Sequence, residues 1–230
     1  MTQDLTAALD LEAQLYAAIR RRYADPKDLG APVDDEDVAE LEASVGVRLP
    51  EDFRRFCTHF ADFAPCPYTP VDTSAHPFEI ELDQRDGTHD SVGLLWGFGA
   101  SSAARLRRPF PFKARWKGPV SLADVDGRIP TQASPDAYLP SRSFEGVPAG
   151  ATPHDGWLDL WGDLQYCDVW RIGYGLVVSG PARGQVWLSS MQCGLDFVAP
   201  ATLLLRPIAR SFVDWAAMWN GLIPEVPFGG

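Results

Sequence analysis

The sequence predicts an α+β fold, in which N-terminal helices pack on a twisted antiparallel sheet and a C-terminal helix closes the chain. Apolar residues recur at helical spacing near both ends of the chain, whereas several segments between them alternate apolar and polar residues as half-buried strands do. A regular succession of strand, helix and strand is not evident. A doubly wound nucleotide-binding fold is therefore not expected.

The first expected helix runs from Leu5 to Arg22. Its apolar residues recur at intervals of three and four, and three arginines end it, where cations suit the negative end of the helix dipole. Asp25-Pro26 then begins a linker.

Residues 34–56 predict two short helices with a turn between them. Asp34 and Asp35 suit a helix start, because acidic side chains are favoured beside the free N–H groups there. Gly46 suits the left-handed residue that ends a helix, and Leu49-Pro50 begins the second one. The apolar positions share one side of each helix: Val38, Leu41 and Val45 on the first, and Phe53, Phe56, Cys57 and Phe60 on the second.

The rest of the chain predicts strands and one more helix. Alternating patterns mark strands at 78–82, 92–96, 157–161 and 169–172, and residues 176–187 predict a β-hairpin with Pro181 and Gly184 in its turn. Ser211-x-x-Asp214 is a capping box for a last helix. The apolar stripe of this helix consists of Phe212, Trp215, Trp219 and Leu222.

We expect residues 1–230 to form a single domain, because no Ser/Gly linker or charge run divides them. Residues 1–33 are read as an N-terminal helix with its linker. Residues 105–150 are rich in proline and show little periodicity, so they are read as an irregular insertion whose unusual length suggests a role in binding.

The charge distribution limits the classes of partner. A formal net charge of −11 disfavours nucleic acid, because phosphate contacts need a cationic surface. One cluster runs against this balance and has aromatic residues between its members: Arg105, Arg107, Arg108, Lys113, Arg115 and Lys117. A nucleic-acid patch and a surface loop that balances acidic neighbours both explain the cluster, and the loop is favoured.

The sequence predicts no membrane partner. Its longest stretch without a charged residue, from Ser91 to Ala104, is shorter than the roughly 18 residues that a membrane-spanning helix needs. The N-terminus shows no secretory signal, so a cytoplasmic location is expected.

Catalytic and metal motifs are not found in the sequence. The four cysteines form no C-x-x-C pair, and Cys57-x-His59 with Cys66 has neither a fourth ligand nor a regular spacing, so core and loop roles are favoured over zinc. The four histidines are isolated, and neither a Gly-x-Ser-x-Gly elbow nor a His-Glu-x-x-His motif occurs. We expect no cofactor and no enzyme. A hydrolase with an unrecognised carboxylate pair stays an alternative, because the separation of carboxylates is invisible in a sequence.

Several blocks of the sequence resemble the SUKH superfamily, which includes the Smi/Knr cell-wall-assembly regulators. The first block, from Asp34 to Phe56, combines an acidic helix start with Leu41-Glu42, Val45-Gly46, Leu49-Pro50, Asp52 and Phe53. The later blocks are similar to the longer bacterial members: Pro109-Phe110-Pro111-Phe112, the hairpin at 176–187, and Ser211-Phe212-x-x-Trp215. The chain departs from the family at 165–168, where Gln-Tyr-Cys-Asp stands in place of a Gly-Cys-Gly-like element.

The resemblance implies an α+β fold and a function in protein binding. For a bacterial member it implies an immunity protein that binds and neutralises a polymorphic toxin, many of which are nucleases or deaminases. A regulatory scaffold of the Smi/Knr type without a toxin partner is the alternative. The resemblance transfers no catalytic residue, and the sequence gives no oligomeric state.

One group of acids is a candidate contact surface for a cationic toxin. The group lies in a short region without a lysine or arginine before Arg171, and it consists of Asp155, Asp159, Asp163 and Asp168. An acidic surface can steer toward the basic groove of a nuclease and block it. The competing explanation is that these aspartates are the solvent-facing positions of strands and turns, and it is favoured.

Overall fold

The computed structural model describes residues 2–22, 32–60, 105–120, 144–163, 170–192 and 201–224. Within them lie the helices α1 (Thr2–Arg22), α2 (Asp35–Val45), α3 (Glu51–His59) and α6 (Phe212–Trp219), and residues 105–107 form a further helical turn. The same residues contain five strands, β1 (Trp116–Val120), β2 (Trp157–Asp163), β3 (Trp170–Val177), β4 (Val186–Gln192) and β5 (Ala201–Ala209). None of the helices in this part of the chain is both long and apolar enough to cross a membrane.

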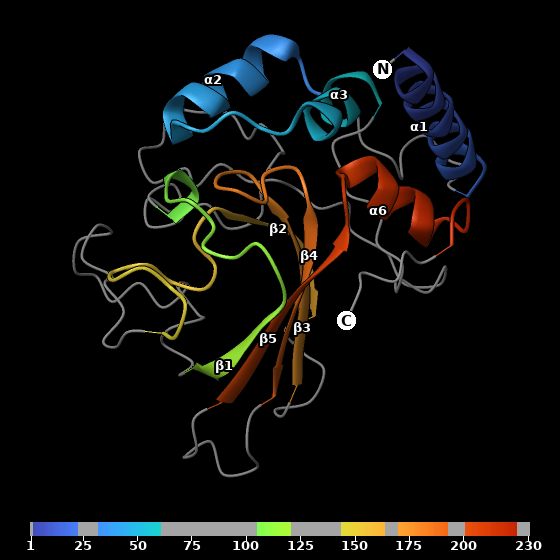
Figure 1. The fold of residues 1–230 in the computed structure, drawn as a ribbon. Helices are drawn as coiled ribbons and strands as arrows, with labels where there is room; N and C mark the ends of the chain where they lie inside the picture. The colour runs from blue at the N-terminus through green and yellow to red at the C-terminus, as the bar shows by residue number, and fades with distance from the viewer. Residues whose placement is uncertain are drawn as a thin grey trace.

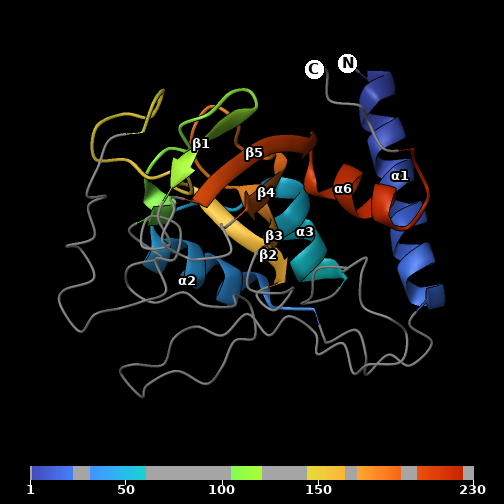
Figure 2. The ribbon, with the colours of Figure 1, turned by 90° about the horizontal axis from the view of Figure 1, so that it is seen from below.

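The strands form one curled antiparallel sheet in the order β1-β5-β4-β3-β2 (Figure 1). Strands β2 to β5 follow each other as a meander, and β1 is added at the β5 edge. Helices and sheet together make an α+β fold, as the sequence predicts. Figure 2 shows α3 and α6 on one side of the sheet, while the segments that precede β1 and β2 lie toward the other side.

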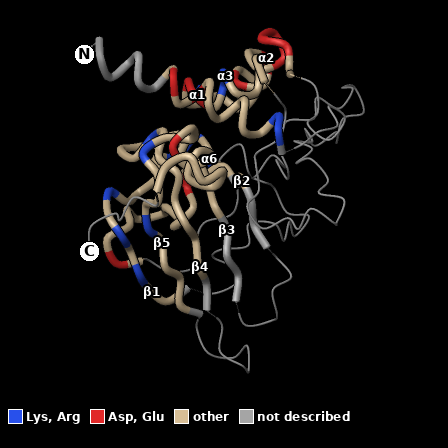
Figure 3. The backbone as a smooth tube through the Cα atoms, turned by 90° about the vertical axis from the view of Figure 1, so that its right-hand side faces the viewer, with Lys and Arg blue, Asp and Glu red and all other residues tan. Residues whose placement is uncertain are grey.

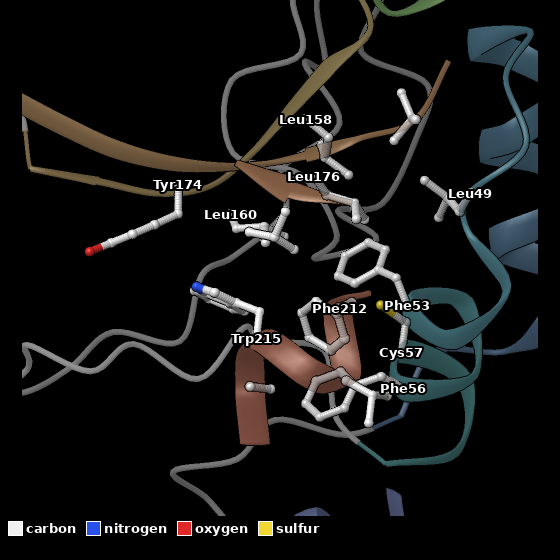
Figure 4. Close-up of a cluster of buried hydrophobic side chains, with 14 of the residues drawn as sticks. Leu49, Phe53, Phe56, Cys57, Leu158, Leu160, Tyr174, Leu176, Phe212 and Trp215 are labelled. Carbon is white, nitrogen blue, oxygen red and sulfur yellow. The ribbon is translucent and has the colours of Figure 1, made fainter. Parts of the chain in front are cut away.

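Each face of the sheet carries apolar side chains that are buried in a hydrophobic core. On the helix side, Tyr174 and Leu176 of β3 join the apolar sides of α2, α3 and α6 in the larger core. Phe212 is the centre of this packing, since its ring lies 4.9 Å from that of Phe53 and 5.0 Å from that of Phe56 (Figure 4). This arrangement buries the apolar stripe predicted for α3 and the Phe212 and Trp215 positions of the α6 stripe, whereas Trp219 and Leu222 are only partly buried.

A smaller core lies on the other face. Trp187 of β4 and Leu205 of β5 are fully buried there against Phe110, which belongs to the segment that precedes β1. The Phe110 and Trp187 rings meet edge to face at 4.8 Å, a favourable geometry for aromatic pairs. Residues 105–112, called the strap below, therefore cover the face of the sheet that the helices leave open.

Helix α1 is held on α3 by a stacked aromatic pair and an ion pair. The rings of Tyr16 and Phe60 stack at 4.4 Å. Glu12 accepts a hydrogen bond from Tyr16 Oη at 2.5 Å and pairs with Arg55 Nη2 at 3.0 Å. Burial acts to raise the pKa of Glu12, but the hydrogen bonds from Arg55 and Tyr16 outweigh it and lower the pKa.

Most of the local predictions are confirmed. Gly46 ends α2 in the left-handed region with φ 71°, and Gly184 closes the β3–β4 hairpin with φ 91°. Ser211 Oγ accepts a hydrogen bond from Asp214 N at 3.0 Å, as a capping box requires. Asp34 precedes α2 as expected, but its side chain makes no capping hydrogen bond.

Two strands depart from the predictions. Residues 105–150 were expected to be irregular, yet Trp116–Val120 is strand β1 and pairs with β5. Strand β5 itself was not predicted, because Leu203-Leu204-Leu205 hides the alternation and Pro207 breaks the pattern. The strands predicted at 78–82 and 92–96 lie outside the described residues.

Asp52 of α3 provides a long-range cap for α6. Its Oδ2 accepts a hydrogen bond from Val213 N at 3.1 Å, in the first turn of α6. Burial raises the pKa of Asp52, although backbone N–H groups that donate to the carboxylate oppose this shift. The start of α6 is thus bound to α3 by a polar contact as well as by the phenylalanine packing.

We predict that Asp52→Ala lowers the free energy of unfolding by about 1–2 kcal/mol, because Val213 N loses its acceptor in a partly buried site. Asp52→Asn keeps an acceptor oxygen and removes a buried charge, so it should retain most of the stability. Urea unfolding followed by circular dichroism measures both. Glu51→Ala is the matched control. The Glu51 carboxylate is exposed, so its removal should change the free energy of unfolding by less than about 0.5 kcal/mol. Equal losses in Asp52→Ala and Glu51→Ala would contradict the capping role.

Candidate functional site

Asp155 is not part of an acidic surface as predicted, because it is fully buried. Its Oδ2 accepts a hydrogen bond from Thr152 N at 2.9 Å, and its Oδ1 accepts one from Thr152 Oγ1 at 2.7 Å. Both carboxylate oxygens therefore stabilise the turn that leads into β2. Asp155 is a structural residue and is unavailable to a partner at the surface.

Two of the other three aspartates of the predicted surface lie in β2. Asp159 lies in β2 opposite Gly175, at a register shift, and Asp163 lies at the end of the same strand opposite Ile172. Their side chains, and the whole of Asp168, lie outside the described residues.

Asp155 stands at a junction where the strap meets the β3–β4 hairpin. Phe110 N donates a hydrogen bond to Ser179 O at 3.0 Å, and Ser179 Oγ donates one to Arg108 O at 2.5 Å. Gly156 N donates to Arg105 O at 2.8 Å and accepts at its own carbonyl from Val178 N. The residues around the predicted contact surface therefore fix the strap to the sheet.

Two glycines make this close approach possible. Gly156 and Gly180 have φ of 67° and 95°, and a Cβ atom on either would lie within 2.8 Å of backbone atoms of the strap. Gly184 has a similar φ of 91°, but a Cβ there would meet nothing within 4 Å. Of these three glycines, only the first two are required by packing as well as by conformation.

His154 and Ser189 form the described pair that most resembles a base and a nucleophile. His154 Nε2 lies 3.0 Å from Ser189 Oγ, on the strap side of the sheet. Burial and the nearby Arg105 charge lower the pKa of His154 to about 3, so the ring is a weak base at neutral pH. Its Nδ1 is buried without a hydrogen-bond partner among the described residues, and the adjacent Asp155 carboxylate is bound to Thr152. The pair therefore lacks, in the described part of the chain, the acid that orients and activates the histidine of a catalytic triad.

The carboxylates with shifted pKa values have structural partners. Asp52 caps α6, and Glu12 binds Arg55 and Tyr16. Among the described residues, no group of three or more His, Cys, Asp and Glu side chains is placed to hold a metal ion. Cys57 is buried in the larger core, whereas Cys66, the third member of the zinc candidate, lies outside the described residues.

The basic cluster of the sequence divides into two parts in the structure. Arg107 Nε donates to Val45 O at 2.6 Å and so caps the C-terminal end of α2, while Arg108 Nη1 donates to Gly150 O at 3.3 Å. Lys113, Arg115 and Lys117 are instead exposed. Part of the cluster therefore stabilises the fold, and the remainder is available at the surface.

Strand β5 adds Arg206 to the exposed cations, although Arg206 is far from the basic cluster in the sequence. Arg206 is exposed on β5, and Lys117 lies opposite Leu204, two residues before Arg206. We call Lys117, Arg206 and the adjacent Arg115 the β1–β5 cationic surface. In the sequence, Leu203 and Leu205 alternate with Leu204 and Arg206. This alternation places Arg206 on the exposed face only once β5 is recognised as a strand.

Comparisons with known proteins identify no relative of this chain. No protein-family model matches the chain, and neither a curated protein nor a solved structure does.

We predict that Gly180→Ala destabilises the protein far more than Gly184→Ala. Both substitutions place a side chain in the left-handed region, which costs about 1–2 kcal/mol. Only the methyl group introduced by Gly180→Ala would also strike the Phe110 backbone, so this variant should lose about 3 kcal/mol or more. Chemical unfolding of the two variants measures the difference. Similar losses would mean that the strap shifts freely and does not depend on the junction.

His154 should make the protein less stable as the pH falls below 6.5. Its pKa is about 3 in the folded state against an ordinary value of 6.5, so the unfolded state binds more protons between these values. The stabilisation from a neutral His154 is complete above about pH 6.5 and is lost progressively toward pH 3. Thermal melts across this range should therefore show a shallower decline for His154→Gln than for the wild type. Parallel declines in the two proteins would contradict the prediction.

Proposed function

We propose that this chain is a protein-binding immunity protein of the SUKH type, which neutralises a bacterial toxin by binding it directly. The observation that carries the proposal is that the sequence blocks of the resemblance, although far apart in the chain, contact one another. This is the behaviour expected of residues that define one fold.

The first block contacts the hairpin block through a backbone anchor. Arg183 Nη2 donates hydrogen bonds to Leu49 O at 2.9 Å and to Arg48 O at 3.2 Å. These carbonyls lie in the turn between α2 and α3, which is the most distinctive part of the first block. The hairpin turn is therefore bound to the helical pair.

The first block also contacts the last block, and the Pro-Phe-Pro-Phe block contacts the hairpin. Asp52 caps the start of α6, and Phe53 packs on Phe212. Phe110 binds the Ser179 backbone and packs on Trp187. The residues that join these blocks are occupied by contacts within the fold, so we expect toxin binding to use exposed residues instead.

The charge of the chain supports a toxin with a basic surface. The net charge of −11 attracts a cationic protein at long range, and a nuclease toxin carries such a surface at its substrate groove. Exposed acids at the start of α2, among them Asp34 and Glu36, contribute to this negative charge (Figure 3).

The proposal predicts that co-expression of the chain rescues bacteria from the toxin domain encoded beside it. The two proteins should also co-elute in size-exclusion chromatography, because neutralisation is by binding. A catalytically inactive toxin variant should form the same complex, which separates binding from any repair of toxin damage. The absence of both rescue and complex would refute the immunity function.

Affinity purification from the native source separates immunity from a regulatory scaffold. An immunity protein should recover one secreted toxin domain, whereas a scaffold of the Smi/Knr type should recover a stable cellular partner from unchallenged cells. Recovery of the cellular partner alone would favour the scaffold function.

A further inference from the structure

The β1–β5 cationic surface brings like charges together on one face of the sheet. Lys117 lies directly opposite Leu204, and Arg206 is the next residue on the same side of β5. The intervening positions, Trp116 and Leu205, alternate to the other face and pack in the smaller core. Both cations therefore project on the side away from the strap, within the range at which cross-strand side chains interact.

No ion pair between described residues stabilises this arrangement. Lys117, Arg206 and Arg115 are exposed, and none forms an ion pair or a side-chain hydrogen bond with a described residue. Like charges on neighbouring strands repel each other and lower stability. In Figure 3 the basic positions follow β1 and the neighbouring part of β5, well separated from the acidic start of α2.

A structural role does not explain the whole of the β1–β5 cationic surface. Lys117 and Pro119 on the edge strand β1 are typical devices against edge-to-edge aggregation. Arg206, however, lies on β5, which is paired with β1 on one side and with β4 on the other. Arg107 and Arg183 show how this fold uses arginines structurally, since each binds backbone carbonyls. Arg206 and Lys117 have no such contact with the residues that the structure describes.

We propose that the β1–β5 cationic surface binds an acidic polypeptide segment of a protein partner. Leu204, which is only partly buried, lies opposite Lys117 and two residues before Arg206, so it offers an apolar contact beside both cations. Carboxylates of the segment would neutralise the repulsion between Lys117 and Arg206. The inference does not require that the partner is a toxin.

A nucleic-acid strand fits this surface less well than an acidic segment does. Binding to single strands uses exposed aromatic rings for base stacking, but Phe110 and Phe112 of this region are buried on the opposite face of the sheet.

The test measures binding of a fluorescein-labelled hexaglutamate peptide by fluorescence anisotropy at low ionic strength. The wild type should bind the peptide, and Lys117→Glu/Arg206→Glu should bind it about tenfold more weakly or not at all, because two attractive charges become repulsive. The matched control is Arg21→Glu/Arg48→Glu, which changes the net charge equally at exposed cations outside the surface and should retain binding. Binding should also weaken as salt is raised, since the contacts are exposed.

Three outcomes would overturn the proposal. The first is a wild type that does not bind hexaglutamate, or equal binding by the two charge variants. The second is tighter binding of a labelled oligothymidylate of the same charge, lost in Lys117→Glu/Arg206→Glu, which would assign the surface to nucleic acid. The third is dimerisation in analytical ultracentrifugation that the same variant abolishes, which would assign the surface to a second copy of the chain.

Circular dichroism of each variant checks that it remains folded. If the double glutamate variant does not fold, Lys117→Gln/Arg206→Gln replaces it, because it removes both charges without reversing them. Rescue from a toxin that persists in either variant while hexaglutamate binding is lost would leave the immunity function intact and place toxin binding elsewhere.

Discussion

The backbone contact between the strap and the β3–β4 hairpin is the constraint on which the rest of the structure depends. The sheet carries large apolar residues on both faces, and the helices can cover only one of them. Phe110 completes the other face, and its position is fixed by the hydrogen bond from its N–H to Ser179 O. That bond needs Gly156 and Gly180, because any side chain at these positions would occupy the space of the strap backbone.

The same principle of long-range backbone anchoring recurs on the helix side. Arg107 from the strap binds the Val45 carbonyl at the C-terminal end of α2, and Arg183 from the hairpin binds the Leu49 carbonyl in the turn that follows. Asp52 performs the converse role when it accepts the N–H of Val213 at the start of α6. Polar contacts between distant segments thus fix the orientation of elements that the hydrophobic effect only brings together. This explains why charged residues stand inside sequence blocks for which no catalytic motif is found.

Two groups of exposed charges of opposite sign lie on different elements of the described structure. The exposed start of α2 is acidic, whereas the exposed positions along β1 and Arg206 of β5 are basic. A partner that meets both surfaces would be oriented as well as attracted, since complementary fields define one approach direction. The proposals for an immunity function and for an acidic partner segment therefore concern different parts of the molecule.

The sequence by itself determined the helices, the β3–β4 hairpin and the caps at Gly46 and Ser211, because these depend on periodicity and on residues with local conformational preferences. It did not determine β1 and β5. Strand β1 is short, and the apolar run of β5 is uninterrupted by polar residues, so the two faces of each strand are defined only when it pairs with a neighbour. It also placed Asp155 at the surface from its charge alone, although Thr152 satisfies the buried carboxylate. Only the tertiary structure decided which arginines serve the fold and which remain exposed, since that depends on carbonyls and strand registers contributed by residues far apart in the chain.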